Sequence, residues 1–208
     1  MNIQPVVEGF GEISSLPVLV RRLRDIAEVH EIDVNRPIRR PRGRLVIEAF
    51  LREVVQLARR QEECGAILVV LDADDDCPAE MAPSLKAWAS EEAGDIPCDI
   101  VMPKREFEAW FLAAIESLRG SRGIRDDAAS HQDPEAPRDA KGKLEACMRQ
   151  GASYYEKADQ PALTAQFDMR EAHHRCRSFR KLVKAFGDLT AAMGHPIEVW
   201  PPADWGEE

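Results

Sequence analysis

Long apolar segments are missing from this 208-residue sequence, in which no fully apolar run exceeds seven residues. A helix that crosses a bilayer needs about 20 such residues, so we expect no membrane span. The first residues also lack the basic and then apolar pattern that is typical of a signal peptide. The five cysteines are scattered and form no C-x-x-C pair, which argues against a disulfide framework and a structural zinc site. These absences predict a cytoplasmic protein with reduced thiols.

An excess of positive charge is missing as well. The formal net charge is −9, and an acidic protein is by itself a poor non-specific DNA binder. The charge is unevenly distributed, because residues 61–100 contain one basic and 11 acidic side chains. Basic side chains gather in a run without an acid and in a later pair: Arg36, Arg39, Arg40, Arg42 and Arg44, then Lys104 and Arg105. These residues either contact a phosphate backbone or form a solvated surface.

The first half of the chain alternates between two hydrophobic patterns. Short apolar stretches predict strands at residues 2–7, 29–34, 66–71 and 98–102. Apolar residues at helical spacing predict helices at residues 14–27, 44–62, 79–92 and 106–118. The alternation predicts an α/β domain over residues 1–118, with a parallel four-stranded sheet flanked by helices.

The second half of the chain has a different composition. Residues 119–143 are rich in glycine, proline, aspartate, serine and arginine, which indicates a loop or a flexible excursion. Residues 144–208 predict a C-terminal helical extension that packs on the α/β core, with a predominantly extended tail from residue 196.

Carboxylates gather where the predicted strands end. Glu8 follows the first strand and Asp72 follows the third, within a stretch that holds four aspartates in five residues. Glu12 comes four residues after Glu8, across a glycine-containing turn. Asp74 shares a side with Asp72 if the chain is extended there. Because ligands of open parallel sheets bind outside the carboxyl ends of the strands, we expect these four carboxylates around one crevice.

A buried carboxylate without a partner is costly, so such a cluster predicts a bound cation. Oxygen ligands suit Mg²⁺ or Mn²⁺, which bind one or two carboxylates together with water and substrate phosphate. One or two such ions support phosphoryl transfer, because a metal lowers the pKa of bound water and stabilises the leaving oxygen. A glutamate that binds no metal could then act as general acid or base.

The same residues carry a family resemblance. Glu8-Gly9-x-Gly11-Glu12 and Leu71-Asp72-x-Asp74 resemble the signature of the Toprim domain, which topoisomerases, bacterial primases and OLD-family nucleases share. A wider set of motifs is similar to DUF4276, a Toprim-related bacterial family of unknown function. Those motifs are Lys104-Arg105-Glu106-Phe107-Glu108-x-Trp110-Phe111, Tyr155-x-Lys157-x-Asp159 and Ser178-Phe179.

The resemblance implies a Toprim-like (Rossmann-like) fold and a nuclease that acts on DNA or RNA. Its catalytic and metal-binding residues would be Glu8, Glu12, Asp72 and Asp74, and Glu106 or Glu108 could complete the metal site. Relatives of this kind are often encoded beside an AAA-type or ABC-type ATPase in clusters that look like anti-phage defence. The sequence has no G-x-x-x-x-G-K-[ST] phosphate loop, so we expect such an ATPase to be a separate protein.

Structural alternatives stay open for several of these residues. Asp72 and Asp74 could cap a helix or a turn, although Asp75 and Asp76 before Pro78 are better placed for that. Glu106 and Glu108 could belong to a solvated helix face. A second group, His173, His174 and Cys176, favours surface or core packing over a soft-metal site.

Two classes of function remain. The first is a metal-dependent nuclease or another phosphoryl-transfer enzyme. The second is a non-catalytic or latent Toprim-like subunit that acts as scaffold or sensor with an ATPase. A third class, a phosphatase or a sugar-nucleotide transferase that uses Asp-x-Asp, is disfavoured. A haloacid-type phosphatase would need an aspartate where Glu8 stands, and a transferase of this kind is usually a larger chain.

Overall fold

The computed structural model describes residues 1–206 and contains one parallel sheet. Its strands are β1 (Asn2–Val7), β2 (Asp33–Val34), β3 (Ile38–Arg39), β4 (Cys64–Val70) and β5 (Cys98–Val101). The order is β2-β1-β4-β5, and β3 also pairs with β1. All pairings are parallel. β2 and β3 therefore form one interrupted edge, and Pro37 lies in the interruption, where it has no N–H to donate.

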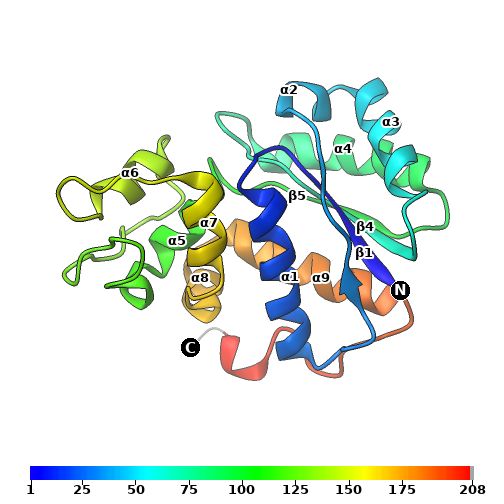
Figure 1. Cartoon of the computed structure of the whole chain (residues 1–208). Coiled ribbons are helices and arrows are strands. Elements are labelled where there is room, and N and C mark those ends of the chain that lie inside the picture. The colour runs from blue at the N-terminus through cyan, green and yellow to red at the C-terminus, as the bar shows by residue number, and fades with distance from the viewer. Residues whose placement is uncertain (207–208) are drawn as a thin grey trace.

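Helices cover both faces of the sheet, as Figure 1 shows. Helices α1 (Glu12–Ala27) and α9 (Arg177–Ala192) share one apolar cluster with one set of strand residues. Helices α3 (Glu48–Ala58) and α4 (Pro78–Ala93) share a second cluster with the residues that point the other way. This two-sided burial explains the continuous apolar run of β4, in which Ala66 to Val70 are fully buried.

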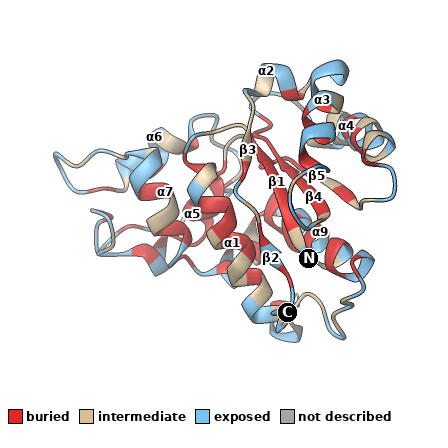
Figure 2. Cartoon of the chain, turned by 45° about the vertical axis from the view of Figure 1, so that its right-hand side comes forward, coloured by how far each residue is buried: buried red, intermediate tan, exposed pale blue. Residues whose placement is uncertain are grey.

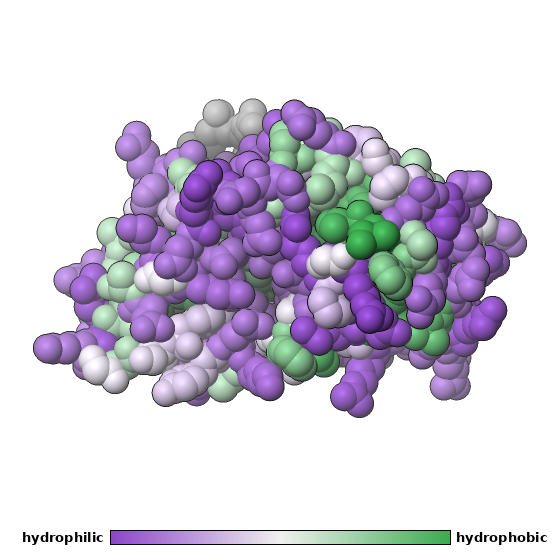
Figure 3. Space-filling model, turned by 90° about the horizontal axis from the view of Figure 1, so that it is seen from above, coloured by the Kyte–Doolittle hydropathy of each residue, from purple (hydrophilic) through white to green (hydrophobic). Residues whose placement is uncertain are grey.

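The remaining elements are short. They are α2 (Arg42–Leu45), α5 (Ala109–Ala113), α6 (Ala140–Ala146), α7 (Glu156–Thr164) and α8 (Met169–Arg175), with 3₁₀ helices η1 (Ile115–Leu118) and η2 (Ala203–Trp205). Aromatic rings join the C-terminal helices to the region after β5. Trp110 lies 4.6 Å from Phe107 and 5.3 Å from Phe179, measured between ring centroids. The buried residues in Figure 2 accordingly extend from the sheet into the C-terminal helices. The face of the molecule in Figure 3 is mostly hydrophilic, with a few apolar side chains between the polar ones.

The parallel α/β sheet expected from the sequence is confirmed, with five strands where four were predicted. The additional strand, β3, has only two residues, too few for a hydrophobic pattern. The helix predicted at residues 44–62 is divided into α2 and α3, because Ile47 between them has extended backbone angles.

The region predicted as a loop behaves mainly as one. Residues 119–139 contain neither helix nor strand apart from an isolated bridge between Ile124 and Met148. Helix α6 then begins at Ala140, and Asp139 caps it by accepting a hydrogen bond of 2.8 Å from the Gly142 N–H. In the tail from residue 196 the described part is irregular except for η2. Across residues 1–206, none of the helices combines the length and the hydropathy that a bilayer crossing requires.

Candidate functional site

Strand order reverses between β1 and β4, and the space beyond the carboxyl ends of these two strands is called the crevice. The chain leaves β1 towards β2 and β3 on one side and returns to β4 on the other side, so strand order reverses at this point. Open parallel sheets bind ligands at such a reversal, beyond the carboxyl ends of the strands. Glu8 directly follows β1, Asp72 follows β4, and the Asp72 N–H donates a hydrogen bond of 3.2 Å to Glu8 Oε2. Two residues that are 64 positions apart therefore meet at the crevice.

Glu12 lies beside them because its side chain folds back over the loop after β1. Its Oε2 accepts hydrogen bonds from the Gly9 N–H at 2.9 Å and from the Glu8 N–H at 3.2 Å. The side chain begins α1 and is only 2% exposed. A glycine is needed at position 11, because a Cβ there would lie 2.5 Å from Gln160 Oε1 on α7. The missing side chain lets α7 pack against the loop between β1 and α1.

The end of β5 contributes a third group to the site. Asp72, which is 5% exposed, accepts a hydrogen bond of 2.9 Å from the Phe107 N–H. Glu108, next in the chain, is fully buried, and its Oε1 accepts from Tyr154 Oη at 2.8 Å and Gln160 Nε2 at 3.0 Å. Its other oxygen, Oε2, is buried and has no hydrogen-bond donor among the described residues. An unpartnered buried carboxylate oxygen is costly unless a cation or a proton neutralises it.

Burial raises the pKa values of the carboxyls at the crevice, and neighbouring carboxylates raise three of them further. For Glu8, burial and then the charge of Asp74 raise the pKa from 4.5 to about 7. For Glu12, burial and then the charges of Glu8 and Glu108 raise the pKa to about 8, against the hydrogen bonds from the loop. The pKa of Asp72 is raised well above its usual range by burial and by Glu12, Glu108 and Glu8. Burial also raises the pKa of Glu108. The carboxyls are therefore close enough to act as one electrostatic group.

A lysine that the sequence analysis did not select balances part of this charge. Lys141, in α6, has a raised pKa because Glu108, Glu156 and Asp72 outweigh its burial. Its Nζ lies 3.4 Å from Glu156 Oε2, and Glu156 Oε1 accepts a hydrogen bond of 2.8 Å from the Gly11 N–H. The lysine comes from the segment predicted as a loop, where neither spacing nor a motif marked it.

Tyr154, Gln160 and Glu156 were also missed. They belong to α7 and the residues before it. The only signal near them was the Tyr155-x-Lys157-x-Asp159 motif, whose side chains have other contacts. Tyr155 is exposed, and Asp159 binds Arg122.

Asp74 and Glu106 differ from the rest of the predicted set. Asp74 has φ 49° and is exposed, so the chain is not extended there and its carboxylate does not share the buried environment of Asp72. Its Oδ2 lies 3.3 Å from Arg42 Nε, although its charge still reaches Glu8. Glu106 Oε2 accepts a hydrogen bond from the Lys141 N–H at 3.0 Å and so binds the start of α6.

Two of the five predicted phosphate-binding residues contact the loop after β4. Arg42 donates from Nε to the Asp72 carbonyl at 2.8 Å, and its guanidinium also pairs with Asp76. Arg105 Nη1 donates to the Asp74 carbonyl at 2.9 Å and pairs with Asp75. Both arginines therefore hold the loop after β4.

The other three predicted cations have different surroundings. The guanidinium of Arg39 lies 3.7 Å from the ring centroid of Phe10, a half-exposed side chain at the mouth of the crevice. Arg40 donates to the carbonyl of Arg39. Lys104 lines a separate groove that begins at the end of β5.

The donor set fits a hard divalent cation in kind, since it consists of carboxylate oxygens and includes the unpartnered Oε2 of Glu108. The residues are not arranged as ready ligands, however. Within residues 1–206 no three His, Cys, Asp or Glu side chains form a group that could hold a metal ion as they stand. Backbone N–H groups bind Glu12, Glu8 and Asp72 instead. Binding of a cation would require these carboxylates to reorient.

Comparison with known proteins gives one match. The family model with the description "Domain of unknown function (DUF4276)" matches residues 7–186, which is most of the chain. The chain therefore belongs to that family. Neither the curated proteins nor the solved structures contain a significant match.

Proposed function

We propose that this member of the DUF4276 family is a metal-dependent phosphoryl-transfer enzyme, a Toprim-like nuclease that acts on nucleic acid. The convergence of buried carboxyls at the ends of three neighbouring strands carries this proposal. Burial raises the pKa of each of these carboxyls, and neighbouring carboxylates raise those of Glu12 and Asp72 further. The cluster would therefore cost stability without a counter-ion. Clusters of perturbed carboxyls in a crevice are typical of catalytic sites.

Each carboxyl has a role that follows from its position. Asp72 and Glu12 are buried beside Glu8 and would hold Mg²⁺ or Mn²⁺, together with the fully buried Glu108. When bound, the metal would polarise the phosphoryl group and a water molecule. Glu8 is more exposed and has a pKa of about 7, which suits a group that accepts and returns a proton near neutral pH. Lys141 would add a positive charge beside the transferred phosphate.

The partner is also part of the proposal. The family resemblance supports a separate AAA-type or ABC-type ATPase and a role as effector in anti-phage defence. The sequence itself has no phosphate loop of the G-x-x-x-x-G-K-[ST] type, so ATP hydrolysis would have to come from another chain.

A second candidate is a latent or non-catalytic subunit of the same assembly. The hydrogen bonds from backbone N–H groups to Glu12, Glu8 and Asp72 favour it, because they hold the site in a state that is not yet a ligand set. In that case a partner would trigger the reorientation of the carboxylates.

The test is cleavage of plasmid DNA and of RNA with Mn²⁺ or Mg²⁺ by the purified chain. We expect Glu8→Gln and Asp72→Asn to lower the rate by at least about 100-fold, since each removes a proton-transfer or charge-stabilising group. Glu53→Gln, which changes an exposed carboxylate on α3, is the matched control and should cleave like the wild type. Equal cleavage by all variants would exclude the proposal. Absence of cleavage, together with stable co-purification with an ATPase, would favour the second candidate.

A further inference from the structure

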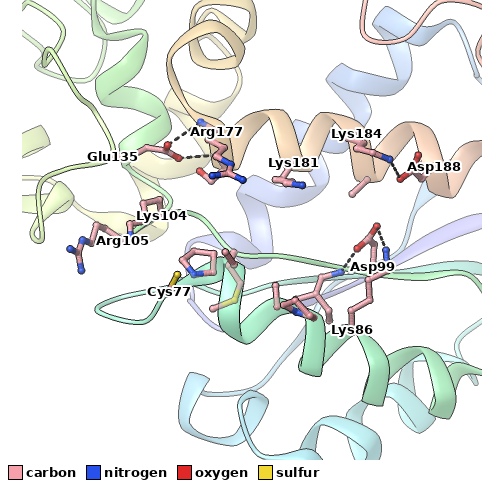
Figure 4. Close-up of a pocket in the computed structure, with 18 of the residues that line it drawn as sticks. Cys77, Lys86, Asp99, Lys104, Arg105, Glu135, Arg177, Lys181, Lys184 and Asp188 are labelled. Carbon is pink, nitrogen blue, oxygen red and sulfur yellow. Dashed lines mark hydrogen bonds and ion pairs between the residues drawn. The ribbon is translucent and has the colours of Figure 1, made fainter.

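A groove with a volume of about 980 Å³ lies on the open side of β5, between α4 and α9. Figure 4 shows its walls, with α9 above, α4 below and the residues around Glu135 at one end. The groove is at the upper end of the size range of small-ligand pockets. The groove is separate from the acidic crevice, but the two are linked by one short segment of chain. Lys104 and Arg105 line the groove, and Phe107, two residues later, donates a hydrogen bond to Asp72 in the crevice.

Positive charge predominates in the groove, whereas the whole chain has a net charge of −9. The charged lining residues are Lys86, Lys104, Arg105, Arg177, Lys181 and Lys184 against Asp99, Asp133, Glu135 and Asp188. Two of the four acids pair with lysines of the lining, and the other two accept backbone hydrogen bonds, Asp133 from the Glu135 N–H at 3.1 Å. Lys86 Nζ lies 2.9 Å from Asp99, Lys184 Nζ lies 2.5 Å from Asp188, and Glu135 accepts hydrogen bonds from the backbone N–H groups that begin α9.

Three cations are left over. The side chains of Lys104, Arg177 and Lys181 form no ion pair with any residue that the structure describes. Arg177, Lys181 and Lys184 follow one another at intervals of four and three residues, so they lie along one face of α9. At 1.5 Å per residue they span about 10 Å, which is about three nucleotides of a strand that rises 3.4 Å per phosphate.

The floor of the groove indicates what it does not bind. It is formed by small or aliphatic side chains, among them Ala82, Pro83, Ile100 and Met102, and none of the residues 1–206 that line it is aromatic. Bases therefore find no ring on which to stack, and recognition would fall to the sugar–phosphate backbone. The Ile100 N–H, on the open edge of β5, already donates a hydrogen bond of 2.8 Å to Asp99 Oδ1. A peptide that added a strand to this edge would need that donor.

We propose that this groove binds the sugar–phosphate backbone of a single-stranded nucleic acid, without sequence preference, and leads the strand towards the acidic crevice. The inference rests on the proposed function for its direction. The choice of a nucleic-acid backbone as the ligand follows from the positive charge of the groove, the cations aligned on α9 and the occupied N–H of Ile100 at the strand edge.

The experiment is a salt titration of the binding of a short labelled single strand of mixed sequence, with a chelator present so that no cleavage is required. For single strands the logarithm of affinity falls with the logarithm of salt by about 0.7 for each phosphate neutralised. Lys181→Ala should therefore reduce the slope by about 0.7 and weaken binding about fivefold at 0.1 M salt. Arg60→Ala removes an exposed arginine at the end of α3 and should change neither value. Both side chains are exposed, so both variants should fold.

Absence of strand binding, or equal binding by wild type, Lys181→Ala and Arg60→Ala, would overturn the inference. It would also be overturned if polyglutamate displaced the strand at an equal concentration of charge, since the groove would then suit an acidic protein segment. The two proposals fail separately. Strand binding that depends on Lys181 without cleavage by any metal would refute the enzyme alone, and metal-dependent cleavage unaffected by Lys181→Ala would refute the groove alone.

Discussion

Replacement of Glu12 by glutamine should stabilise the protein in the absence of metal and should remove its response to metal. The side chain is 2% exposed, and the pKa of its carboxyl is raised from 4.5 to about 8. The folded protein therefore holds this proton more tightly than the unfolded chain does. The stability that this proton contributes is fully present below about pH 4.5 and is lost as the pH rises through about 8.

The size of the effect follows from the shift. One pKa unit corresponds to about 1.4 kcal/mol, so the wild type at pH 7 has lost about 3 kcal/mol relative to pH 4.5 through this group alone. Glutamine is neutral at every pH, and its carbonyl oxygen can still accept the N–H groups of Glu8 and Gly9. Its amide N–H₂ needs hydrogen-bond acceptors in a buried place, which costs about 1 kcal/mol of stability at every pH. We therefore expect a gain of about 2 kcal/mol at pH 7 and a loss of about 1 kcal/mol near pH 4.5, where only the cost of the amide is left.

Urea unfolding in the presence of a chelator, at about pH 5, 7 and 8, measures this difference directly. The corresponding rise in melting temperature is about 4–8 °C at pH 7 for a chain of this length. Addition of Mn²⁺ should then reverse the order, because the wild type gains a bound cation and the variant has lost one of its ligands. Glu53→Gln should follow the wild type throughout.

The reasoning would be refuted if the metal-free wild type were equally stable at about pH 5 and pH 8. It would also be refuted if Glu12→Gln were destabilising at pH 7 while Glu53→Gln was neutral. Either result would mean that burial and the neighbouring carboxylates do not raise the pKa of Glu12 in solution.

Four further outcomes test separate parts of the structure. Addition of Mn²⁺ at about pH 7 should release about one to two protons per protein, measured in weak buffer, and almost none near pH 10, because the two glutamates after β1 are deprotonated there. Gly11→Ala should lower the free energy of unfolding by about 1–3 kcal/mol in urea, since its Cβ would lie 2.5 Å from Gln160 Oε1. Trp110→Phe should cost about 1–3 kcal/mol by removing the 2.8 Å hydrogen bond to Ser178 Oγ, and a second change, Ser178→Ala, should recover part of it. Arg42→Gln should speed amide hydrogen exchange in residues 72–76, because four contacts to that loop are lost, and leave α9 unchanged.

The meeting of Glu8 and Asp72 could be predicted from the sequence because it depends on topology. Strand-like and helix-like patterns alternate, parallel strands end at one edge, and a residue that follows a strand lies at that edge. The predicted α/β class and the positions of β1, β4 and β5 follow from the same patterns. Membership in DUF4276, expected from a small set of motifs, is confirmed over residues 7–186.

The rest of the site depends on tertiary contacts that leave no local pattern. Lys141 belongs to a segment without hydrophobic periodicity. Gln160 belongs to α7, almost 150 residues after Glu12, so nothing in the local sequence links it to the site. Asp74 departs from the expected alternation because the backbone turns into the left-handed region directly after β4. A one-residue change of backbone direction of this kind cannot be read from residue types that suit both a strand end and a turn.

The way in which the carboxyls are held bears on their purpose. Backbone N–H groups hold three of the carboxyls: Gly9 donates to Glu12, Phe107 donates to Asp72, and Asp72 donates to Glu8. These donors belong to the segments that follow β1, β5 and β4, so the sheet limits how far the carboxyls can move. A site that served folding alone could hold the same donors with neutral amides, which would lack the mutual repulsion. The chain instead keeps ionisable groups where burial raises their pKa values, at a cost in stability that an amide would not have. Such a cost is expected where the charge is needed for binding or catalysis, and a single set of amide variants therefore decides the question. Variants that gain stability without metal and lose cation binding indicate a functional site, whereas variants that lose stability indicate a structural network.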